Sequence, residues 1–346
     1  MADYGALVLV SFGGPEGPAD VIPFLENVTA GRGVPRARLD QVAEHYYSFG
    51  GVSPINQQCR DLITAVEKDF AARDVSLPVY WGNRNWQPYL ADTLAKMAAD
   101  GVTSAMAFVT SAYSSFSSCR QYLDDIERAR AQVGAGAPRV DKIRQYYNHP
   151  GFIGPFAAAA AAAAWSLPAG TGDDYDLVFA AHSIPDAMAA ASGPSGNAYQ
   201  AQLADAASLI AGELGYRRPW RMAYSSRSGP PAQPWLEPDI NDLLAELAAA
   251  GSRAVVVVPV GFVSDHMEVK FDLDVEAAQT ADRLGLAFAR AATPGTDSRF
   301  VSMITDLVLE RLDGTPAATV GSLGPGPDSC PAGCCGTAQS RPSVTR

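Results

Sequence analysis

Basic residues, histidines, cysteines and long apolar runs are all scarce in this sequence of 346 residues. Lys and Arg number 26 against 37 Asp and Glu, which gives a formal net charge of −11. Because a nucleic-acid backbone needs a basic surface, this balance excludes bulk nucleic-acid binding and disfavours anionic membrane surfaces. No uninterrupted apolar run reaches the roughly 18 residues of a membrane span, so we expect no transmembrane helix.

The N-terminus lacks the features of a signal peptide. No basic segment precedes its apolar run at residues 6–10, which has the length of a buried first strand. We therefore expect a cytoplasmic protein. Five cysteines in such a protein argue against a disulfide framework and leave core, metal-binding or catalytic roles.

Short apolar segments alternate with longer segments of helical character, and 47% of the residues are hydrophobic. This alternation predicts parallel sheets in an α/β fold, with binding sites at the carboxyl ends of the strands. The expected strands are residues 7–11, 79–81, 105–109, 176–180, 222–225, 255–260 and 286–289. The expected helices are residues 20–28, 57–72, 89–99, 120–133, 199–214, 240–249 and 297–311.

The alternation is interrupted near residues 145–165, where a run of alanines at 157–164 predicts a helix and needs no functional explanation. About four strands fall on each side of this break. We predict two similar domains facing one cleft, residues 1–145 and 146–312, with the last helix able to pack back on the first domain. The Gly- and Pro-rich residues 313–346 form a tail that only its cysteines would tie down.

A histidine stands directly after a predicted strand. His182, in the segment AHSIP, follows DLVFA at the edge where such sheets place ligands. A lone histidine is about as often a capping or core residue. Because the chain has only 4 histidines, this placement favours a functional role.

Three carboxylates follow the strand VVVVPV. Glu268, Asp272 and Glu276 are spaced by four residues and share one face of a helix. Such a row repels itself, so it is either a solvated acidic face or a path for cations. Its attachment to the segment Asp-His-x-Glu at a strand end favours the cation path.

Glycine-rich and aromatic loops follow the strands of the first half. SFGGP allows a ligand to approach the backbone closely, but it lacks the third glycine of a dinucleotide-binding fingerprint. The loops GGVSP, GNRNW and YSSFSSCRQY combine Tyr, Ser and Arg. That combination suits a flat aromatic ligand that carries carboxylates.

Three cysteines, Cys330, Cys334 and Cys335, lie within one short segment of the tail. They supply three of the four ligands that an iron–sulfur or zinc centre takes. The fourth comes from Cys119, in a Ser-rich loop, or from Cys59. The helical pattern around Cys59 indicates a core or surface thiol instead.

These segments together resemble the ferrochelatases, the enzymes that insert ferrous iron into a porphyrin. The resemblance extends from residue 7 to about residue 312 and rests on SFGGP, GGVSPINQQ, GNRNWQPYL, AHSIP, YSSRSGPPAQPWLEPDI and PVGFVSDHMEVKFDLDVE, in the family's order. It implies two Rossmann-like domains of the chelatase type, each a four-stranded parallel sheet flanked by helices, with a cleft between them.

The resemblance also implies roles for the residues that carry the chemistry. His182 suits a base and iron ligand, and Glu268 suits a group that relays protons and guides the metal. His266 tunes that glutamate, and Asp272 and Glu276 extend a metal path toward solvent. Which of His182 and Glu268 takes the protons stays open.

The family has two branches that act on different porphyrins. The stretch FLENVTAGRGVPRARLDQVAEHYY distinguishes them, because it is polar where membrane-associated members carry a hydrophobic lip. The chain is thus similar to the soluble Gram-positive-type members, which convert coproporphyrin III to coproheme. In that branch the residues matching Tyr46, Ser53 and Tyr122 hold propionates, and Arg32 is a further candidate partner. Phe12 stands where many members have a tyrosine, and it stacks on the porphyrin without ligating iron. The expected partners are porphyrin and Fe²⁺, with transient contacts to neighbouring haem-pathway enzymes, no nucleic acid and no stable membrane insertion.

The tail is similar to that of a bacterial branch with a [2Fe–2S] cluster on three tail thiols and one internal thiol. The matching residues are Cys119, Cys330, Cys334 and Cys335. The alternatives are a protoporphyrin IX ferrochelatase, a cobalt or sirohydrochlorin chelatase, a solute-binding protein, or a non-catalytic haem or iron–sulfur sensor on the same scaffold. Zinc is the alternative occupant of the cysteines.

Overall fold

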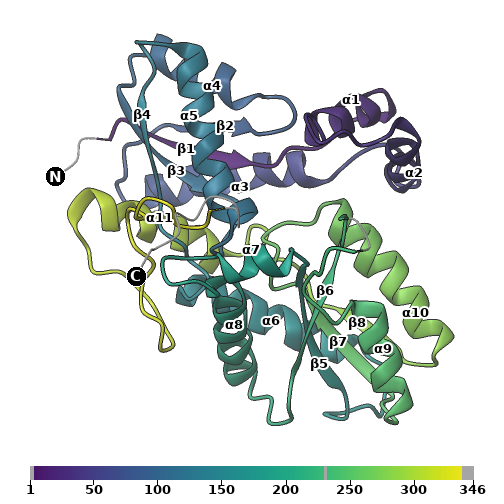
Figure 1. Cartoon of the computed structure of the whole chain (residues 1–346). Helices are drawn as coiled ribbons and strands as arrows, with labels where there is room; N and C mark the ends of the chain where they lie inside the picture. The colour runs from purple at the N-terminus through teal and green to yellow at the C-terminus, as the bar shows by residue number, and fades with distance from the viewer. Residues whose placement is uncertain (1–3, 230–231, 337–346) are drawn as a thin grey trace, which may run out of the picture.

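Two four-stranded parallel sheets, each flanked by helices, form the two halves of the molecule (Figure 1). The computed structural model describes residues 4–229 and 232–336. Residues 337–346 of the predicted tail, and the two prolines at 230–231 in the YSSRSGPPAQPWLEPDI motif, lie outside the described residues. The sheets confirm the predicted fold class, whereas the domain boundaries stay a prediction.

The two sheets repeat one topology, β2-β1-β3-β4 and β6-β5-β7-β8. The first strand of each half is central and pairs in parallel with two neighbours, because each crossover carries a helix. The strands are β1 Ala6–Ser11, β2 Val79–Asn83, β3 Ser104–Val109, β4 Arg139–Lys142, β5 Asp176–His182, β6 Arg221–Ser225, β7 Ala254–Val258 and β8 Ala287–Arg290. Every residue of β1, β3 and β7 is buried, as their continuous apolar runs predict.

The helices of the first half are α1 Pro18–Val28, α2 Arg36–Tyr47, α3 Ile55–Ala72, α4 Leu90–Ala99, the π-helix η1 Phe116–Arg120 and α5 Gln121–Val133. Those of the second half are α6 Pro150–Ser166, α7 Asp186–Ala190, α8 Ala198–Leu214, α9 Ile240–Ala249, the π-helix η2 Glu268–Ala277, α10 Ala278–Arg283 and α11 Ser298–Asp313. None of the helices in the described part of the chain is long and apolar enough to cross a membrane.

Helix α3 shows how the sequence pattern sets a core face. Its buried residues Ile55, Cys59, Leu62, Val66 and Phe70 recur every three or four positions and turn one stripe toward the sheet. Cys59 belongs to this stripe, and burial raises the pKa of its thiol to about 11. It is therefore a protonated core thiol, whereas a metal ligand is a thiolate.

Helices α1 and α2 form a lobe that extends from the first half and lies over the second (Figure 1). The lobe has a small core of its own, made of Val21, Phe24, Leu25, Leu39 and Ala43. At its tip the rings of His45, on α2, and Phe271, on η2, stack with centroids 3.7 Å apart and 9° between their planes. This stack ties the lobe to the helix that carries the predicted carboxylates.

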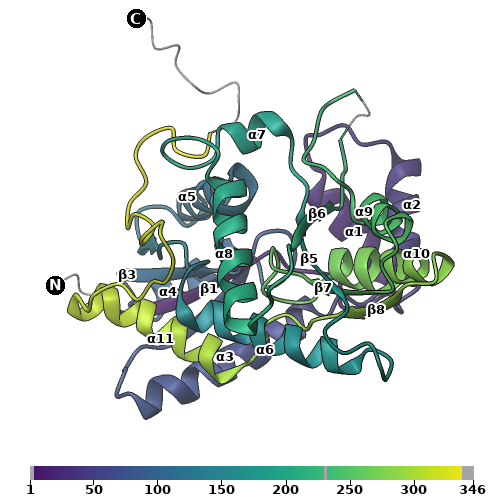
Figure 2. The same ribbon diagram turned by 90° about the horizontal axis from the view of Figure 1, so that it is seen from below.

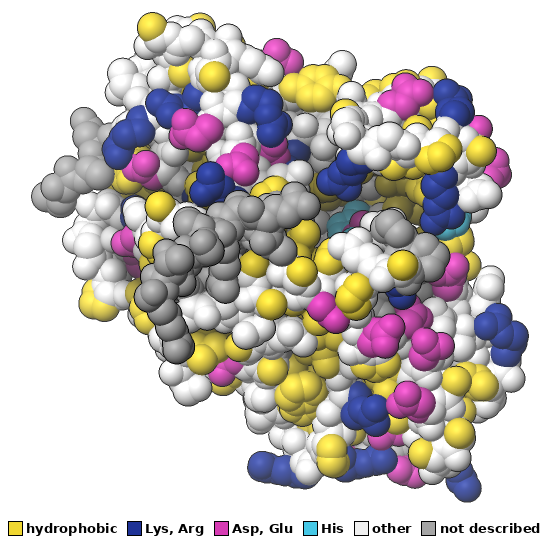
Figure 3. Space-filling view, in the orientation of Figure 1, with side chains coloured by type: hydrophobic (Ala, Val, Ile, Leu, Met, Phe, Trp, Pro, Cys, Tyr) yellow, Lys and Arg dark blue, Asp and Glu magenta, His cyan; other side chains and the backbone are white. Residues whose placement is uncertain are grey.

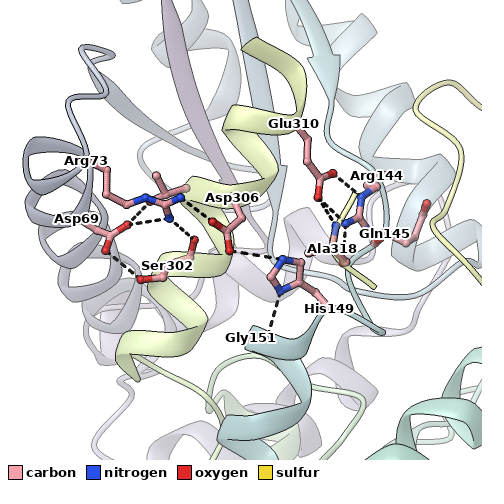
Figure 4. Close-up of polar contacts among 11 residues, drawn as sticks. Asp69, Arg73, Arg144, Gln145, His149, Gly151, Ser302, Asp306, Glu310 and Ala318 are labelled. Atoms are coloured by element: carbon pink, nitrogen blue, oxygen red, sulfur yellow. Dashed lines mark hydrogen bonds and ion pairs between the residues drawn. The ribbon is translucent and has the colours of Figure 1, made fainter. Parts of the chain in front are cut away.

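Helix α11 packs back on the first half, against α3 (Figure 4). Arg73 donates to Asp306 over 2.7 Å, and Ser302 Oγ donates to Asp69 over 3.0 Å. Further along, the buried Arg144 guanidinium donates two hydrogen bonds to the Glu310 carboxylate. A buried, hydrogen-bonded pair of this kind fixes the orientation of a helix because neither partner can be lost alone without leaving a buried charge.

The tail continues from α11 along α8 toward α7 (Figure 2). Val320 N donates to the carbonyl of Asn148, and the Asn148 amide donates to the carbonyl of Gly324. Arg144 also donates to the carbonyl of Ala318. These contacts hold the tail against the segment that joins the two halves and bring its cysteines back to the first half.

His149 caps the N-terminus of α6, where its Nδ1 accepts from Gly151 N over 3.0 Å. Its Nε2 lies 3.7 Å from the Asp306 carboxylate (Figure 4). The imidazole must be neutral for Nδ1 to accept, and burial lowers its pKa to about 4 although Asp306 opposes the shift.

We expect His149 to make stability depend on pH. Its folded-state pKa lies below the unfolded value near 6.5, so its contribution is complete above that value and is lost as pH falls toward 4. Between about pH 7.5 and 5 the loss is about 2 kcal/mol. Urea midpoints of His149→Asn, which retains a capping acceptor, should vary less with pH than those of the wild type; parallel curves would contradict this reading.

Candidate active site

His182 and Glu268 face one another where two neighbouring strands of the second sheet end. His182 is the last residue of β5, and Glu268 begins η2 in the connection that follows β7. His182 Nε2 lies 3.4 Å from Glu268 Oε1, and His182 Nδ1 donates to the carbonyl of Ser183. The structure therefore brings together two residues that sequence reasoning placed at separate strand ends.

Each member of this pair stabilises the charge of the other. Burial alone would lower the pKa of His182, but the Glu268 carboxylate overrides it and raises the pKa to about 9. Burial likewise disfavours the Glu268 carboxylate, and His182 overcomes it, which lowers the pKa of Glu268 to about 2. At neutral pH the pair is therefore an imidazolium–carboxylate pair: His182 carries the proton and Glu268 is ionised.

The three predicted carboxylates lie on η2, which is a π-helix instead of the expected α-helix. From Glu268 and Asp272, which are half-buried, the row reaches the exposed Glu276. Asp272 accepts a hydrogen bond from Ser226 Oγ. Burial, together with Glu268 and Glu276, raises the pKa of Asp272 to about 7.

A second set of acids on the same segment is neutralised. Asp274 pairs with Lys270 and with Arg290, and Arg290 also pairs with Asp265. Within residues 4–229 and 232–336, by contrast, no Lys or Arg forms an ion pair with Glu268, Asp272 or Glu276. The row that leads from the His182 pair to solvent thus keeps its affinity for cations.

His266 supports Glu268 from behind. Its Nδ1 accepts from Glu268 N over 3.2 Å, and its ring lies edge-on to Phe262 with centroids 5.0 Å apart. Burial lowers the pKa of His266 although Glu268 opposes the shift. A neutral His266 orients the first residue of η2, and its tuning role stays a prediction.

The α1–α2 lobe and the strand ends of the first half supply aromatic rings. Phe24 lies edge-on to both Phe12 and Tyr46, with centroid distances of 6.2 and 5.8 Å. Burial raises the pKa of Tyr46, and the negative charges of Glu268 and Asp272 raise it further. The phenol thus lies close enough to both carboxylates to interact with them electrostatically. Figure 3 shows histidine side chains inside a hollow between the lobe and the second half, with basic side chains at its rim.

The other predicted binding residues lie at different depths. Ser53 and Tyr122 are buried, whereas Arg32 is exposed in the loop between α1 and α2. Arg84, to which the sequence analysis gave no role, has its guanidinium 4.5 Å from the centre of the Tyr122 ring and 5.7 Å from that of Phe12. A cation directly after a strand end was the signal that could have identified it.

The four predicted cysteines meet at one place. Cys119, Cys334 and Cys335 form a buried cluster against which Cys330 packs. Cys119 lies on η1 of the first half, and the other three come from the tail. No group of three or more His, Cys, Asp or Glu side chains in the described ranges has the arrangement of a preformed metal site.

Two N–H groups point at these sulfurs. Gln145 Nε2 donates to Cys119 Sγ over 2.9 Å, and Gly193 N donates to Cys335 Sγ over 3.1 Å. Hydrogen bonds from Cys330 and Cys335 lower the pKa of Cys119, and the pKa values of those two donors are raised in turn. The cluster thus stabilises a thiolate at Cys119 and draws on both halves of the molecule.

Two Rossmann-like halves around such a site define a protein of the chelatase fold. SirB from Bacillus subtilis with Fe³⁺ aligns with a TM-score of 0.51 at 12% identity, covering 90% of this chain and 97% of that chain. A sirohydrochlorin chelatase SirB from Bacillus subtilis subspecies spizizenii in complex with cobalt aligns with a TM-score of 0.50. At 12% identity this second likeness, which covers 90% of this chain and 96% of that one, also shows the fold alone.

The family model described as ferrochelatase matches residues 4–312, so the chain belongs to the ferrochelatase family. Similar proteins are the coproporphyrin III ferrochelatases of Nocardia farcinica, 55% identical over 98% of both chains, and of Streptomyces coelicolor, 51% identical over 99% of this chain and 96% of the relative. A ferrochelatase of Rhodopirellula baltica is 51% identical over 99% of this chain and 96% of its own.

We expect Glu268→Gln to remove the charge that holds His182 protonated. With burial then the largest remaining influence, the pKa of His182 should fall from about 9 to its ordinary value near 6.5 or below. An NMR titration of the histidine ring protons measures it. Glu276→Gln, which changes an exposed member of the row, is the control and should leave the value near 9; an unchanged value in Glu268→Gln would contradict the pairing.

Proposed function

We propose that this protein inserts ferrous iron into coproporphyrin III and forms coproheme in haem biosynthesis. The observation that carries the proposal is the His182–Glu268 pair, which stands at the head of an unneutralised carboxylate row whose charge reaches the phenol of Tyr46. Relatives named coproporphyrin III ferrochelatase, at 50% identity or more over nearly the whole chain, support the choice of porphyrin.

Metal insertion exchanges two pyrrole N–H protons for one Fe²⁺, so the site must accept protons next to the ring. Glu268 is ionised and is the group ready to accept the first proton. His182 is already protonated at neutral pH, so its Nε2 becomes a base only after Glu268 has passed the first proton on and has then taken the proton of His182.

The second proton requires that the pair discharge the first. Asp272 has a pKa near 7 and follows Glu268 on the same helix. Its protonated and ionised forms therefore have similar free energies at neutral pH, so that it can both take up and release protons. The exposed Glu276 continues the row to solvent. Protons leave and iron enters along the same carboxylates, which keeps the charge of the row nearly constant.

The porphyrin ring fits against Phe12 and Tyr46, with its propionates toward polar groups of the first half. The Arg84 guanidinium lies over the rings of Phe12 and Tyr122 and helps to fix them. Arg32, Tyr46, Ser53 and Tyr122 are the proposed propionate partners. A rigid grip on the periphery also supplies the force that tilts the pyrrole nitrogens toward the metal.

Coproporphyrin III should be the preferred substrate over protoporphyrin IX. It carries four propionates where protoporphyrin IX carries two, and each charge-assisted hydrogen bond contributes about 1.5–3 kcal/mol. We therefore expect kcat/KM with ferrous iron to be at least about tenfold higher for coproporphyrin III. Anaerobic absorbance assays with both porphyrins measure it, and equal values would refute the assignment.

His182→Ala should lower kcat by about 10² to 10⁴-fold, the usual cost of losing a general base, while fluorescence titration shows coproporphyrin still bound. Asp272→Asn removes the proposed proton relay and should lower kcat as well as raise KM for iron. Glu276→Gln should act mainly at low ferrous iron, raising KM for iron more than it lowers kcat. The three variants are compared at low and saturating iron. An equal loss of saturating rate in all of them would show that the row is not a metal path.

We also propose that Cys119, Cys330, Cys334 and Cys335 hold a [2Fe–2S] cluster. Four sulfurs gathered at one buried place, with N–H donors from Gln145 and Gly193, fit the thiolate ligation and sulfur hydrogen bonds of such centres. When bound, the cluster would supply a covalent link between the tail and η1, and the proposed iron insertion takes no step through it.

Cys119→Ser should therefore remove the visible absorbance of anaerobically purified protein together with its bound iron and sulfide. It should also lower the unfolding temperature, because the crosslink closes a long loop. Cys59→Ser changes a core thiol of the same half and should keep colour and iron. Colourless, zinc-containing wild-type protein would instead assign the cysteines to zinc.

A further inference from the structure

The ammonium of Lys142 is buried without a carboxylate partner. Lys142 ends β4, only 8% of its surface is exposed, and its Nζ donates to the carbonyl of Ile143 over 2.9 Å. Across residues 4–229 and 232–336 it forms no ion pair. Burial of a lone ammonium costs several kcal/mol, so a fold that retains one calls for an anion nearby.

The carboxylates near Lys142 are already committed. Asp141 accepts from Tyr4 Oη and from Arg139, each over 2.7 Å. Asp328, on the tail, pairs with Arg311 over 3.3 Å. Protein acids therefore do not supply the missing anion.

The cysteine cluster lies beside this ammonium. Lys142 and Cys330 line one cavity of about 230 Å³, together with Asp141, Asp328 and Ser329. Hydrogen bonds from the other thiols lower the pKa of Cys119 most, and the Lys142 ammonium lowers it further. The segment after β4 also supplies Gln145, which donates to Cys119 Sγ. One short stretch thus places a charge near the cysteine cluster and an N–H group on the Cys119 sulfur.

We propose that Lys142 is the fixed counter-charge of the metal-loaded cysteine cluster and raises its reduction potential. The inference rests on the proposed [2Fe–2S] cluster. Four thiolates and two sulfides leave that cluster net negative with both irons ferric, and one electron that reduces one iron makes it more negative still. A buried cation therefore stabilises the reduced form more than the oxidised form.

The test is a mediated anaerobic redox titration of the cluster-loaded protein, followed by electron paramagnetic resonance. Lys142→Met should shift the reduced-to-oxidised ratio at a fixed potential at least tenfold toward the oxidised form, which for one electron is about 59 mV. Lys142→Arg keeps the charge and should stay within threefold of the wild type. Lys96→Met removes the same charge from an exposed site on α4, where the side chain is 67% exposed, and should leave the ratio unchanged.

Cluster retention provides a second readout if Lys142→Met loads poorly. Its iron should be lost to a chelator several-fold faster than that of the wild type, and Lys142→Arg should restore retention. Equal loss in both variants would mean that the shape of lysine, not its charge, matters, and would overturn the inference.

An unchanged potential in loaded Lys142→Met would overturn the inference and leave the cluster proposal standing. Wild-type protein without iron and sulfide would overturn both. Neither result affects the proposed insertion of iron into coproporphyrin III, which is measured separately with free ferrous iron.

Discussion

The imidazolium–carboxylate pair of His182 and Glu268 is the interaction on which the arrangement of the site depends. It forms only because β5 and β7 are neighbours in one parallel sheet, so that their carboxyl ends meet at one edge. The pair is partly exposed, with side-chain exposures of 33% and 42%, and water weakens its contribution to stability. The pair matters for the chemistry instead, because moving its proton between His182 and Glu268 changes which of the two residues can accept another proton.

The two halves that enclose this pair are held together at several places. Helix α11 and the tail connect α3, the segment around Arg144 and the cysteine cluster, and the His45–Phe271 stack joins the lobe to η2. A porphyrin that enters between the two halves meets walls whose separation is already set, which is the condition for applying distortion to a stiff ring.

Sequence patterns predicted most of the strands and the long helices, because buried parallel strands are continuous apolar runs and α3 is strongly amphipathic. They missed β4, a short strand with charged residues, and α2, whose face is mostly polar. The four-residue spacing of the carboxylates did not reveal a π-helix, since both helix types keep such residues on roughly one side. The helical pattern around Cys59 already favoured Cys119 as the fourth cysteine. The roles of Arg84 and Lys142 required the fold, because an unpaired or stacked cation is a property of tertiary packing.

Charge pairing separates the structural acids from the functional ones on η2 and in the segment just before it. Asp274 and Asp265 are held by Lys270 and Arg290, which fixes η2 against β8 and makes them poor ligands. Asp272 and Glu276 have no such partner in the described structure, and burial, with repulsion from Glu268 and Glu276, raises the pKa of Asp272 to about 7. At the cysteine cluster the signs are reversed, because there a cation, Lys142, has no acidic partner in the described structure. In both places a charge left without its partner inside the folded chain indicates which ion, cation or anion, the site is built to receive.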